Sequence, residues 1–490
     1  MHPRTVVLVG AGQFQQRTGD PAVALEPMAM MAAAAELAAE DAGTTKLLAQ
    51  IDSIRVVKGS WPYRDPGRLI AGRIGAQPRE TLLTFEGGNT PQSLVNSTSL
   101  DIEAGRLDVA LLVGGEGIYS RRRAKRAGAT IPYTADPDAA PAQTFGADVT
   151  MSSALESKRG FQMPINVYPM FETAIRHDRG ETPSQHLERI ARIWADFKAV
   201  AVDNPNAWIR TPMTAEQIRT PSADNRLVGY PYTKAMNSNW DLDQAAAVIL
   251  CSVEKAEALG ISRDRWVFPW SGTDAHDTYL ISNRDNYHSS PAIRTAAKEA
   301  LALAGVTLGE VAHVDLYSCF PSAVQIGAAE IGLSEERRLT VTGGLAFAGG
   351  PLNNYVMHAI ATMAATLRDH AGAVGLCSAN GGYVTKHAIG LYSTEPPPQG
   401  QFRHANVQAE VDRFPTREVT GDHVGPATIE AYTVMHDHRG PTEALVSALT
   451  PAGVRTFARS AEADLMAELM SIDAVGRAVD IDAAAAVHLV

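Results

Sequence analysis

The sequence predicts an α/β fold that is built from two copies of one strand-helix unit. In each copy a glycine pair precedes a segment with helical spacing, and an apolar strand then ends on a second glycine pair. The copies are 262 residues apart, and an Ala-rich helical segment upstream recurs at the same offset. Two helix-strand pairs at one offset indicate an internal duplication. The landmarks are Gly87-Gly88, Gly114-Gly115, Gly349-Gly350 and Gly381-Gly382, with Gly43 and Gly305 closing the upstream helices.

The first copy is predicted to occupy residues 1–117, where strand and helix patterns alternate. Such alternation is typical of parallel strands that are joined by crossover helices. In chain order the pattern predicts a strand at 6–9, a helix at 27–42, a strand at 51–57, a helix after Gly88 and a strand at 109–113.

The alternation breaks after residue 117, and residues 118–237 are predicted to form a separate loop domain. This segment is rich in Arg, Pro, Tyr and Trp, with one clear helical pattern at 183–202. Long excursions of this kind are usually functional. Strand-helix order resumes at 238–262, which completes the first half, and the second half is predicted at 263–393.

A change of periodicity predicts an additional C-terminal domain. Residues 394–404 contain three successive prolines and are predicted to be a linker, because proline lacks the backbone donor that helices and sheets need. Residues 405–490 follow with β-type runs at 427–435, 444–449, 455–458 and 475–481, a hairpin turn at 438–440 and one helix at 461–470. This pattern predicts a small β-barrel or sandwich.

The charge balance argues against nucleic acid as a partner. The chain of 490 residues has a net charge of −11, and residues 405–490 contain six arginines and no lysine against thirteen acidic residues. A small OB-type barrel that binds single strands needs a basic groove and exposed aromatic residues, so a protein partner of this domain is the better hypothesis.

The remaining composition predicts a cytoplasmic location. No apolar stretch reaches the roughly 18 residues of a membrane span, and the N-terminus has no signal-peptide cleavage pattern. The three cysteines, Cys251, Cys319 and Cys377, lie in strand-like apolar runs, which favours reduced, buried thiols over disulfides.

Three passages carry a family resemblance: YPMFETAIRHDRGETPSQHLERIARIW, DLDQAAAVILCSVEKAEALG, and VDLYSCFPSAVQIGAAEIGL followed by GGLAFAGGPLNN. In their order and spacing they resemble the thiolase superfamily over residues 1–393, with the closest likeness to thiolases of the sterol-carrier type. The whole chain resembles the thiolase-like proteins of type 1, which carry an extra C-terminal domain. The resemblance implies a layered α-β-α-β-α core.

Thiolase chemistry, by this resemblance, needs two cysteines and two groups that hold the thioester oxygen. The position of the nucleophilic cysteine falls at Gly88, and that of the second cysteine at Asn380. The HDCF histidine becomes Tyr317, and the GHP histidine becomes Gly350. All four positions lack the required chemistry, so Claisen-type activity is expected to be weak or absent.

Other residues are candidates for a relocated or residual site. Cys319 and His358 are candidates for relocated catalytic groups. The alternative role of Cys319 is buried packing, and that of His358 is a helix-capping or core-edge position. The resemblance places coenzyme A near the loop domain, where a cluster of arginines would suit its phosphates. Candidate ligand-binding residues are Arg121, Arg122, Arg123, Asn353, Gly381 and Gly382.

The expected function is that of a thiolase-like protein of acyl-CoA and lipid metabolism that binds an acyl thioester with little or no thiolase activity. One alternative is an active acyltransferase that uses Cys319, and another is a scaffold that binds a partner through the C-terminal domain. No metal and no resident cofactor are expected, with coenzyme A or acyl-CoA as the ligand. The oligomeric state is left open between monomer and homodimer.

Overall fold

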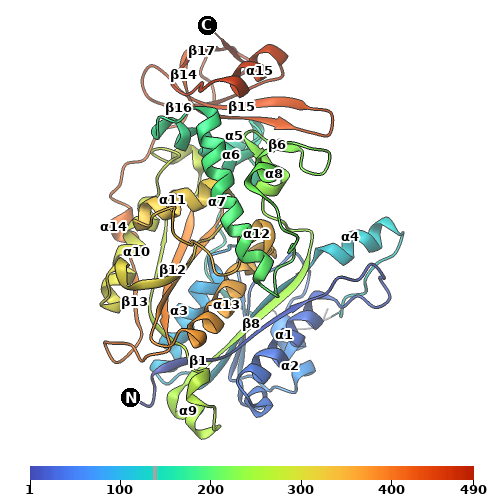
Figure 1. Ribbon diagram of the computed structural model, residues 1–490, viewed down its shortest axis with the longest axis vertical. Helices are drawn as coiled ribbons and strands as arrows, with labels where there is room; N and C mark the ends of the chain where they lie inside the picture. Colours follow the sequence, from blue (N-terminus) through green and yellow to red (C-terminus); the bar gives the residue numbers. More distant parts are fainter. Residues whose placement is uncertain (136–139, 141, 490) are drawn as a thin grey trace.

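The computed structural model describes residues 1–135, 140 and 142–489 of the chain. Three β-sheets organise these residues. Two of them form the lower part of the molecule in Figure 1, and the third lies at the top with the C-terminus. Among the described helices, none is both long and apolar enough to cross a membrane.

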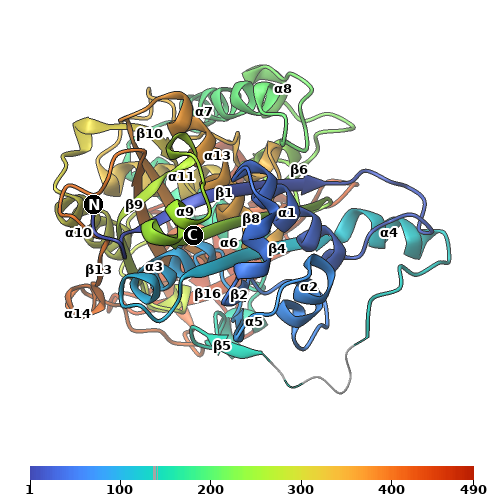
Figure 2. The same ribbon diagram turned by 90° about the horizontal axis from the view of Figure 1, so that it is seen from below.

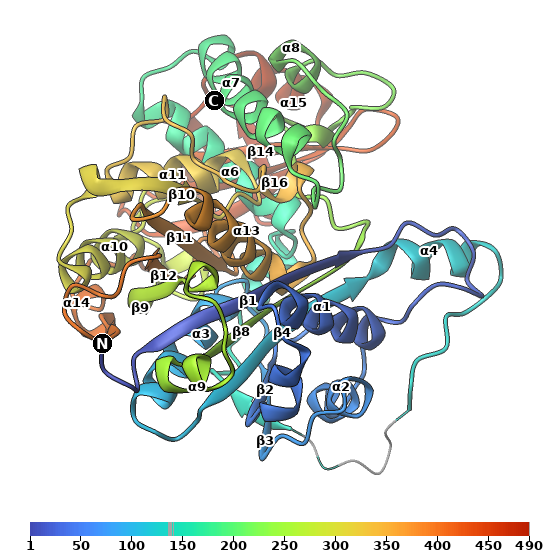
Figure 3. The same ribbon diagram turned by 60° about the horizontal axis from the view of Figure 1, so that its bottom comes forward.

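The first sheet has the strand order β1-β8-β4-β2-β3-β5. Strands β4, β2 and β3 run parallel, whereas β8 is antiparallel to both β1 and β4. Helix α1 lies along this sheet (Figure 3) and α3 packs on its other face. The elements are β1 (Val6–Gln15), α1 (Pro27–Asp41), β2 (Ser53–Val56), α2 (Pro66–Ile74), β3 (Glu80–Thr84), α3 (Thr90–Glu103), β4 (Val109–Gly117), β5 (Gln143–Phe145), β8 (Asp243–Ser252) and α9 (Val253–Ala258).

The second sheet repeats the first and confirms the predicted duplication. Its order β10-β11-β12-β9 has the same sequence of parallel, antiparallel and antiparallel pairings as β2-β4-β8-β1. Helices α3 and α13 touch each other and both sheets, so the core has α-β-α-β-α layers. The elements are β9 (Phe268–His276), α10 (Pro291–Ala304), β10 (Val311–Asp315), α11 (Pro321–Ile331), α12 (Gly344–Phe347), α13 (Tyr355–Asp369), β11 (Val374–Gly381) and β12 (Lys386–Ser393).

Each core sheet also has an added edge strand outside the repeat. Strand β5 runs parallel to β3, and β13 (Arg403–Asn406) runs parallel to β9. Strand β13 begins inside the segment that the prolines predict to be a linker, so the chain adds to the second sheet before it leaves the core. The short helix α14 (Gln408–Val411) follows and packs on α10.

The loop region contains more helix than its sequence pattern predicts. The expected helix at 183–202 is α7 (Pro183–Asp203), but α6 (Pro164–Asp178) is as well formed. Residues 167–176 of α6 are all buried, and Pro169 lies within the helix. A helix that is buried on every side has no amphipathic period, so the pattern does not reveal it. The other elements are α4 (Ile118–Arg126), α5 (Ala154–Lys158), α8 (Ala215–Arg219), β6 (Leu227–Gly229) and β7 (Tyr232–Thr233).

The C-terminal sheet has the order β16-β15-β14-β17-β18 and curls back on itself. A parallel bridge between Arg459 and Ala486 brings β18 to β16, which gives the sheet a barrel-like form. The predicted hairpin turn at 438–440 lies between β14 and β15. The elements are β14 (Gly425–His436), β15 (Pro441–Leu449), β16 (Arg455–Ser460), α15 (Ala463–Ser471), β17 (Ala478–Ile481) and β18 (Val487–Leu489).

A fully buried arginine joins this sheet to the core. Arg455 forms an ion pair with Glu430 of β14 and donates to the backbone carbonyls of Ser282, at 2.8 Å, and of Arg284. Its guanidinium also lies 4.4 Å from the ring centroid of Tyr287. The C-terminal domain is therefore held to the core by polar contacts that are shielded from water.

Glu103 gives the docking of β13 a pH dependence. At the end of α3 it accepts hydrogen bonds from the backbone N–H of Phe402, at 2.7 Å, and of Val6. Burial raises the pKa of Glu103 from 4.5 to about 7, against the effect of these two hydrogen bonds. The folded chain therefore binds this proton more tightly than the unfolded chain. The resulting stability is full below pH 4.5 and is lost as the pH rises through about 7.

We expect a Glu103→Gln variant to lose this contribution to the pH dependence, because the amide does not titrate and still offers an acceptor oxygen. The melting temperature of the native chain, relative to that of the variant, should fall between pH 4.5 and pH 7. Thermal melts of both proteins across that range provide the measurement. Equal changes in the two proteins would contradict the assigned titration.

Candidate functional site

Gly88 lies at the start of α3, against two other positions that the resemblance singles out. A Cβ atom at Gly88 would lie 2.4 Å from the carbonyl oxygen of Asn380 and 2.5 Å from the hydroxyl of Tyr317. Both distances are shorter than real carbon–oxygen contacts. The space that a cysteine side chain would need at this position is thus already filled by the protein.

Gly350 is enclosed by a different loop. A Cβ atom there would lie 2.3 Å from the Ser238 hydroxyl, and the Gly350 N–H donates to the Asn239 carbonyl at 2.8 Å. The loop that holds Gly350 also contains Asn353, whose side-chain oxygen accepts from the N–H of Gly87, next to Gly88, at 3.0 Å. Gly350 therefore belongs to the same set of loops, and a side chain there would meet residues 238–239.

Gly381 and Gly382 complete this set of loops. A Cβ atom on Gly381 would lie 2.7 Å from the side-chain oxygen of Asn89 and 3.1 Å from Gly87 Cα, so the strand end and the helix start are in van der Waals contact. The structure thus brings Gly88, Tyr317, Asn380, Gly381 and Asn353 together. These glycines serve close packing between segments.

Tyr168 of α6 closes the site, although it is not among the residues predicted from the sequence. Its hydroxyl donates to the carbonyl of Gly382 at 2.9 Å and accepts from the Asn380 amide at 3.1 Å and from Val384 N–H at 3.2 Å. The ring stacks on Phe320 with centroids 4.5 Å apart. Burial raises the pKa of Tyr168 well above its usual value, so the phenol stays neutral.

The cavity that remains beside Tyr317 and Asn380 is very small. It has a volume of about 10 Å³, close to what a single water molecule occupies. Ligand pockets are typically about 300–1,000 Å³. The Asn380 side-chain oxygen has no partner among the described residues, and it lines this cavity. There is room here for a solvent molecule but not for an acyl thioester.

Two strained residues flank the closed site. Leu352 has φ of +46° and the buried Val384 has φ of +52°. Positive φ is a genuine outlier for a β-branched residue, and such strain persists where the surroundings hold it. Arg284 donates to the Val384 carbonyl at 2.7 Å while Tyr168 binds its N–H. The closed form of this loop is therefore fixed from both sides.

Neither candidate for a relocated catalytic group is positioned for chemistry. Cys319 is buried, and burial raises the pKa of its thiol to about 12, so it is a neutral thiol at physiological pH. His358 binds the side-chain oxygen of Gln13 in β1 at 2.8 Å. Burial lowers its pKa to about 3, so the ring is neutral. Both residues pack the core.

The arginine cluster lies on α4, at the rim of the molecule and apart from α3 (Figure 2). Arg122 and Arg123 both pair with Asp241, at 3.4 Å and 3.8 Å. Arg121 donates to the carbonyl and hydroxyl oxygens of Ser60 at 3.3 Å and 3.2 Å. The three guanidinium groups are thus engaged within the chain, on a different part of the molecule from Gly88.

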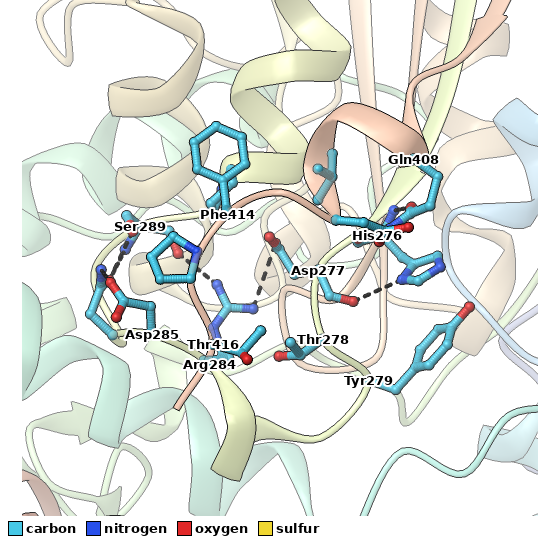
Figure 4. A pocket seen from close by; sticks show the side chains of 15 residues that line it. His276, Asp277, Thr278, Tyr279, Arg284, Asp285, Ser289, Gln408, Phe414 and Thr416 are labelled. Atoms are coloured by element: carbon cyan, nitrogen blue, oxygen red, sulfur yellow. Dashed lines mark hydrogen bonds and ion pairs between the residues drawn. The ribbon is translucent and has the colours of Figure 1, made fainter. Parts of the chain in front are cut away.

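Two open cavities lie elsewhere, along α3 and the end of β9. The larger, of about 520 Å³, is lined by one face of α3, by the ends of β9 and β12, by β13 and by the β5 region; we call it the α3 groove. The smaller, of about 270 Å³, is shown in Figure 4 and is walled by Arg284, Asp277 and Phe414. His276, Tyr279 and Gln408 line both cavities, so the two adjoin.

Comparison with known proteins gives a family match for the C-terminal part. Residues 406–485 match the model described as "Thiolase-like protein type 1 additional C-terminal domain". Among curated proteins, an acetyl-CoA acetyltransferase from Methanothermobacter thermautotrophicus is 25% identical over 195 residues. That alignment covers 40% of this chain and 46% of the relative, so the match spans less than half of that protein.

Solved structures share the fold, and two of them show how far the likeness extends. The crystal structure of a monomeric SCP2-thiolase like protein type 1 from Mycobacterium smegmatis is 30% identical, with a TM-score of 0.85, and the match covers 100% of both chains. An acetyl-CoA acetyltransferase from Syntrophomonas wolfei is 18% identical with a TM-score of 0.56, and the match covers 80% of this chain and 99% of that one. The second likeness shows the fold alone.

Proposed function

Since this chain belongs to the SCP2-thiolase-like proteins of type 1, we propose that it binds an acyl thioester but does not perform the Claisen chemistry of thiolases. The observation that carries the proposal is the filled space at Gly88, where a side chain would meet the Asn380 carbonyl and the Tyr317 hydroxyl. A missing nucleophile can be replaced from nearby only if there is room for substrate. Here the remaining cavity is about 10 Å³.

The absence of thiolase chemistry is also supported by the groups that line this cavity. Tyr317 is partly buried, and desolvation raises its pKa, so it can donate a hydrogen bond but cannot act as a base at neutral pH. Asn380 does not titrate, and glycine at 88 and 350 offers backbone groups alone. Condensation needs a base that removes an α-proton and a nucleophile that holds the acyl group, and these four positions supply neither.

We place the acyl thioester in the α3 groove and not in the closed cavity. The volume of the α3 groove, about 520 Å³, falls within the usual range for small-molecule sites. It begins at the start of α3, next to Gly87, where the Lys386 ammonium is bound to the Glu86 carbonyl. It is lined by both polar and apolar side chains, which suits a ligand with an acyl chain and a polar head.

A ligand titration combined with an activity assay tests this proposal. We expect coenzyme A thioesters to raise the melting temperature by mass action, and acetoacetyl-CoA to undergo no thiolysis above the rate without protein. No shift at millimolar ligand would overturn the binding proposal. Thiolysis at rates of an ordinary thiolase would overturn the chemical one.

The acyltransferase alternative makes a different prediction for Cys319. If this thiol carried the acyl group, a Cys319→Ala variant would lose turnover of acetoacetyl-CoA that the native chain shows. Its buried position and raised pKa favour a packing role instead. The same assay therefore distinguishes the two hypotheses.

A further inference from the structure

The α3 groove contains a histidine that a carboxylate holds in place. His404 of β13 binds the side chain of Asp274 in β9, with 2.9 Å between Nε2 and Oδ2. Asn96 of α3 donates to the same oxygen at 2.9 Å, and the Ser93 hydroxyl donates to the other. Three donors from two elements, α3 and β13, thus converge on one carboxylate at the wall of a large cavity.

This arrangement sets the tautomer of the imidazole. A carboxylate that accepts from Nε2–H leaves the lone pair of a neutral ring on Nδ1. Among the described residues, Nδ1 of His404 has no hydrogen-bond partner, and the His404 side chain lines the groove with 22% of its surface exposed. A base whose orientation is fixed by a second group is the pattern expected of a general-base centre.

Strand register places a cation on the same face of the second sheet. Lys386 is the direct antiparallel partner of His276, which lies two residues beyond Asp274 on β9. Residues at even spacing share a face, and diagonal neighbours across a strand pair are about 7–8 Å apart. Lys386 also lines the groove. It can therefore bind the carbonyl oxygen of a molecule that lies over Asp274 and His404.

The wall that carries His404 is formed by the segment that leads into the C-terminal domain. His404, Asn406 and Gln408 line the α3 groove, and Val411 and Phe414 line the adjoining cavity of Figure 4. The family match for the additional domain begins at residue 406. The C-terminal extension thus completes a site that the duplicated core does not contain by itself.

We propose that the Asp274–His404 pair is a general-base centre that activates water for hydrolysis of an activated acyl compound, a thioester or an ester, in the α3 groove. The water oxygen attacks the acyl carbon while its proton passes to His404 Nδ1. The carbon–sulfur or carbon–oxygen bond then breaks, and the leaving thiolate or alkoxide takes that proton. The products are a carboxylic acid and a thiol or alcohol, and no electrons are exchanged. The choice of a thioester rests on the proposed function.

Other titratable groups face the same groove and enter any pH profile. They are Glu86 from the loop before α3, His276 and Tyr279 from the end of β9, and Lys386 and His387 from β12. Burial lowers the pKa of Lys386. A fall of the rate at low pH is therefore assigned to His404 by comparing the pH–rate profiles of the native chain and of a His404 variant. The native profile alone does not make that assignment.

The test is hydrolysis of acetyl-CoA, a medium-chain acyl-CoA and p-nitrophenyl acetate by the full chain and by a His404→Gln variant. We expect the variant to lose about 100-fold in kcat and to lose the acid limb, because general-base catalysis is typically worth 10²–10⁴-fold. Asp274→Asn changes a positioning residue and should lower kcat with little change in KM. His423→Gln, at an exposed histidine whose contact is the Pro426 carbonyl, is the matched control and should keep the native rate.

Binding of a non-hydrolysable thioether analogue of acyl-CoA, read by thermal shift, separates the two proposals. Native hydrolysis that disappears in His404→Gln while the analogue still binds supports the general-base centre. Analogue binding without native hydrolysis, or hydrolysis unchanged in the variant, overturns it and leaves the proposed function intact. If the analogue does not bind and no substrate is hydrolysed, both proposals are overturned. Hydrolysis of p-nitrophenyl acetate without hydrolysis of either acyl-CoA supports the general-base centre and overturns the thioester as its substrate.

Discussion

A Gly88→Cys variant is expected to be about 3 kcal/mol less stable than the native chain and to gain no thiolase activity. The added Cβ would lie 2.4 Å from the Asn380 carbonyl oxygen, which is backbone and is held in place on β11. The Tyr317 hydroxyl, at 2.5 Å, would also have to move. Urea unfolding gives the free-energy difference, and thiolysis of acetoacetyl-CoA gives the activity.

A matched pair of alanine variants isolates the steric cause of this loss. Gly88→Ala and Gly72→Ala each add one methyl group, but a Cβ on Gly72 of α2 meets no atom within 4 Å. Alanine at an exposed helix position is about 1 kcal/mol better than glycine, so Gly72→Ala should be neutral or stabilising. If Gly88→Ala were equally harmless, the loops around Tyr317 and Asn380 would be free to open, and the closed site would be one of two states.

An Arg455→Ala variant should lower the free energy of unfolding by about 4 kcal/mol, within the range for breaking one partner of a buried ion pair. The change leaves Glu430 without its close partner and leaves the carbonyls of Ser282 and Arg284 without a donor. Because those carbonyls belong to the core, the C-terminal domain should also become easier to detach. Urea unfolding and limited proteolysis measure the two effects.

Arg459→Ala on the same strand is the control for this prediction. Arg459 pairs with Glu443, but its side chain is 46% exposed. Ion pairs of this kind are worth about 0–1 kcal/mol, so the variant should unfold almost as the native chain does. Similar losses in both variants would show that strand β16 is sensitive to any truncation, which would contradict a specific role for the buried guanidinium.

Much of the fold could be predicted from the sequence because it is encoded locally. The repeated glycine pairs, the helical spacing after each and the short β runs of residues 427–481 depend on near neighbours in the chain, and each corresponds to an observed element. Helix α6 could not be predicted in this way, since its burial removes the polar face that marks a helix. Its position inside the molecule is a property of tertiary packing.

The site was predictable in part for the same reason. Gly88, Tyr317 and Asn380, the positions that the motifs single out, lie beside one another, but nothing near them in the sequence shows that Tyr168 closes the space between them. Asp274 and His404 are 130 residues apart. They meet because β13 pairs with β9 in one particular register, and a short polar strand after three prolines gives little sign of that pairing.

The added edge strands have a consequence for self-recognition. An uncovered strand edge presents a row of unsatisfied N–H and C=O groups, which is a template for pairing with another chain. Here β5 occupies that row on β3, and β13 occupies it on β9. A second copy of the chain could pair directly with β3 or β9 only by displacing β5 or β13, and any strand added at these two edges would meet the short strands β5 and β13 instead. The chain thus covers the edges of β3 and β9 with two short strands of its own, one from the loop region and one from the segment that leads to the C-terminal domain.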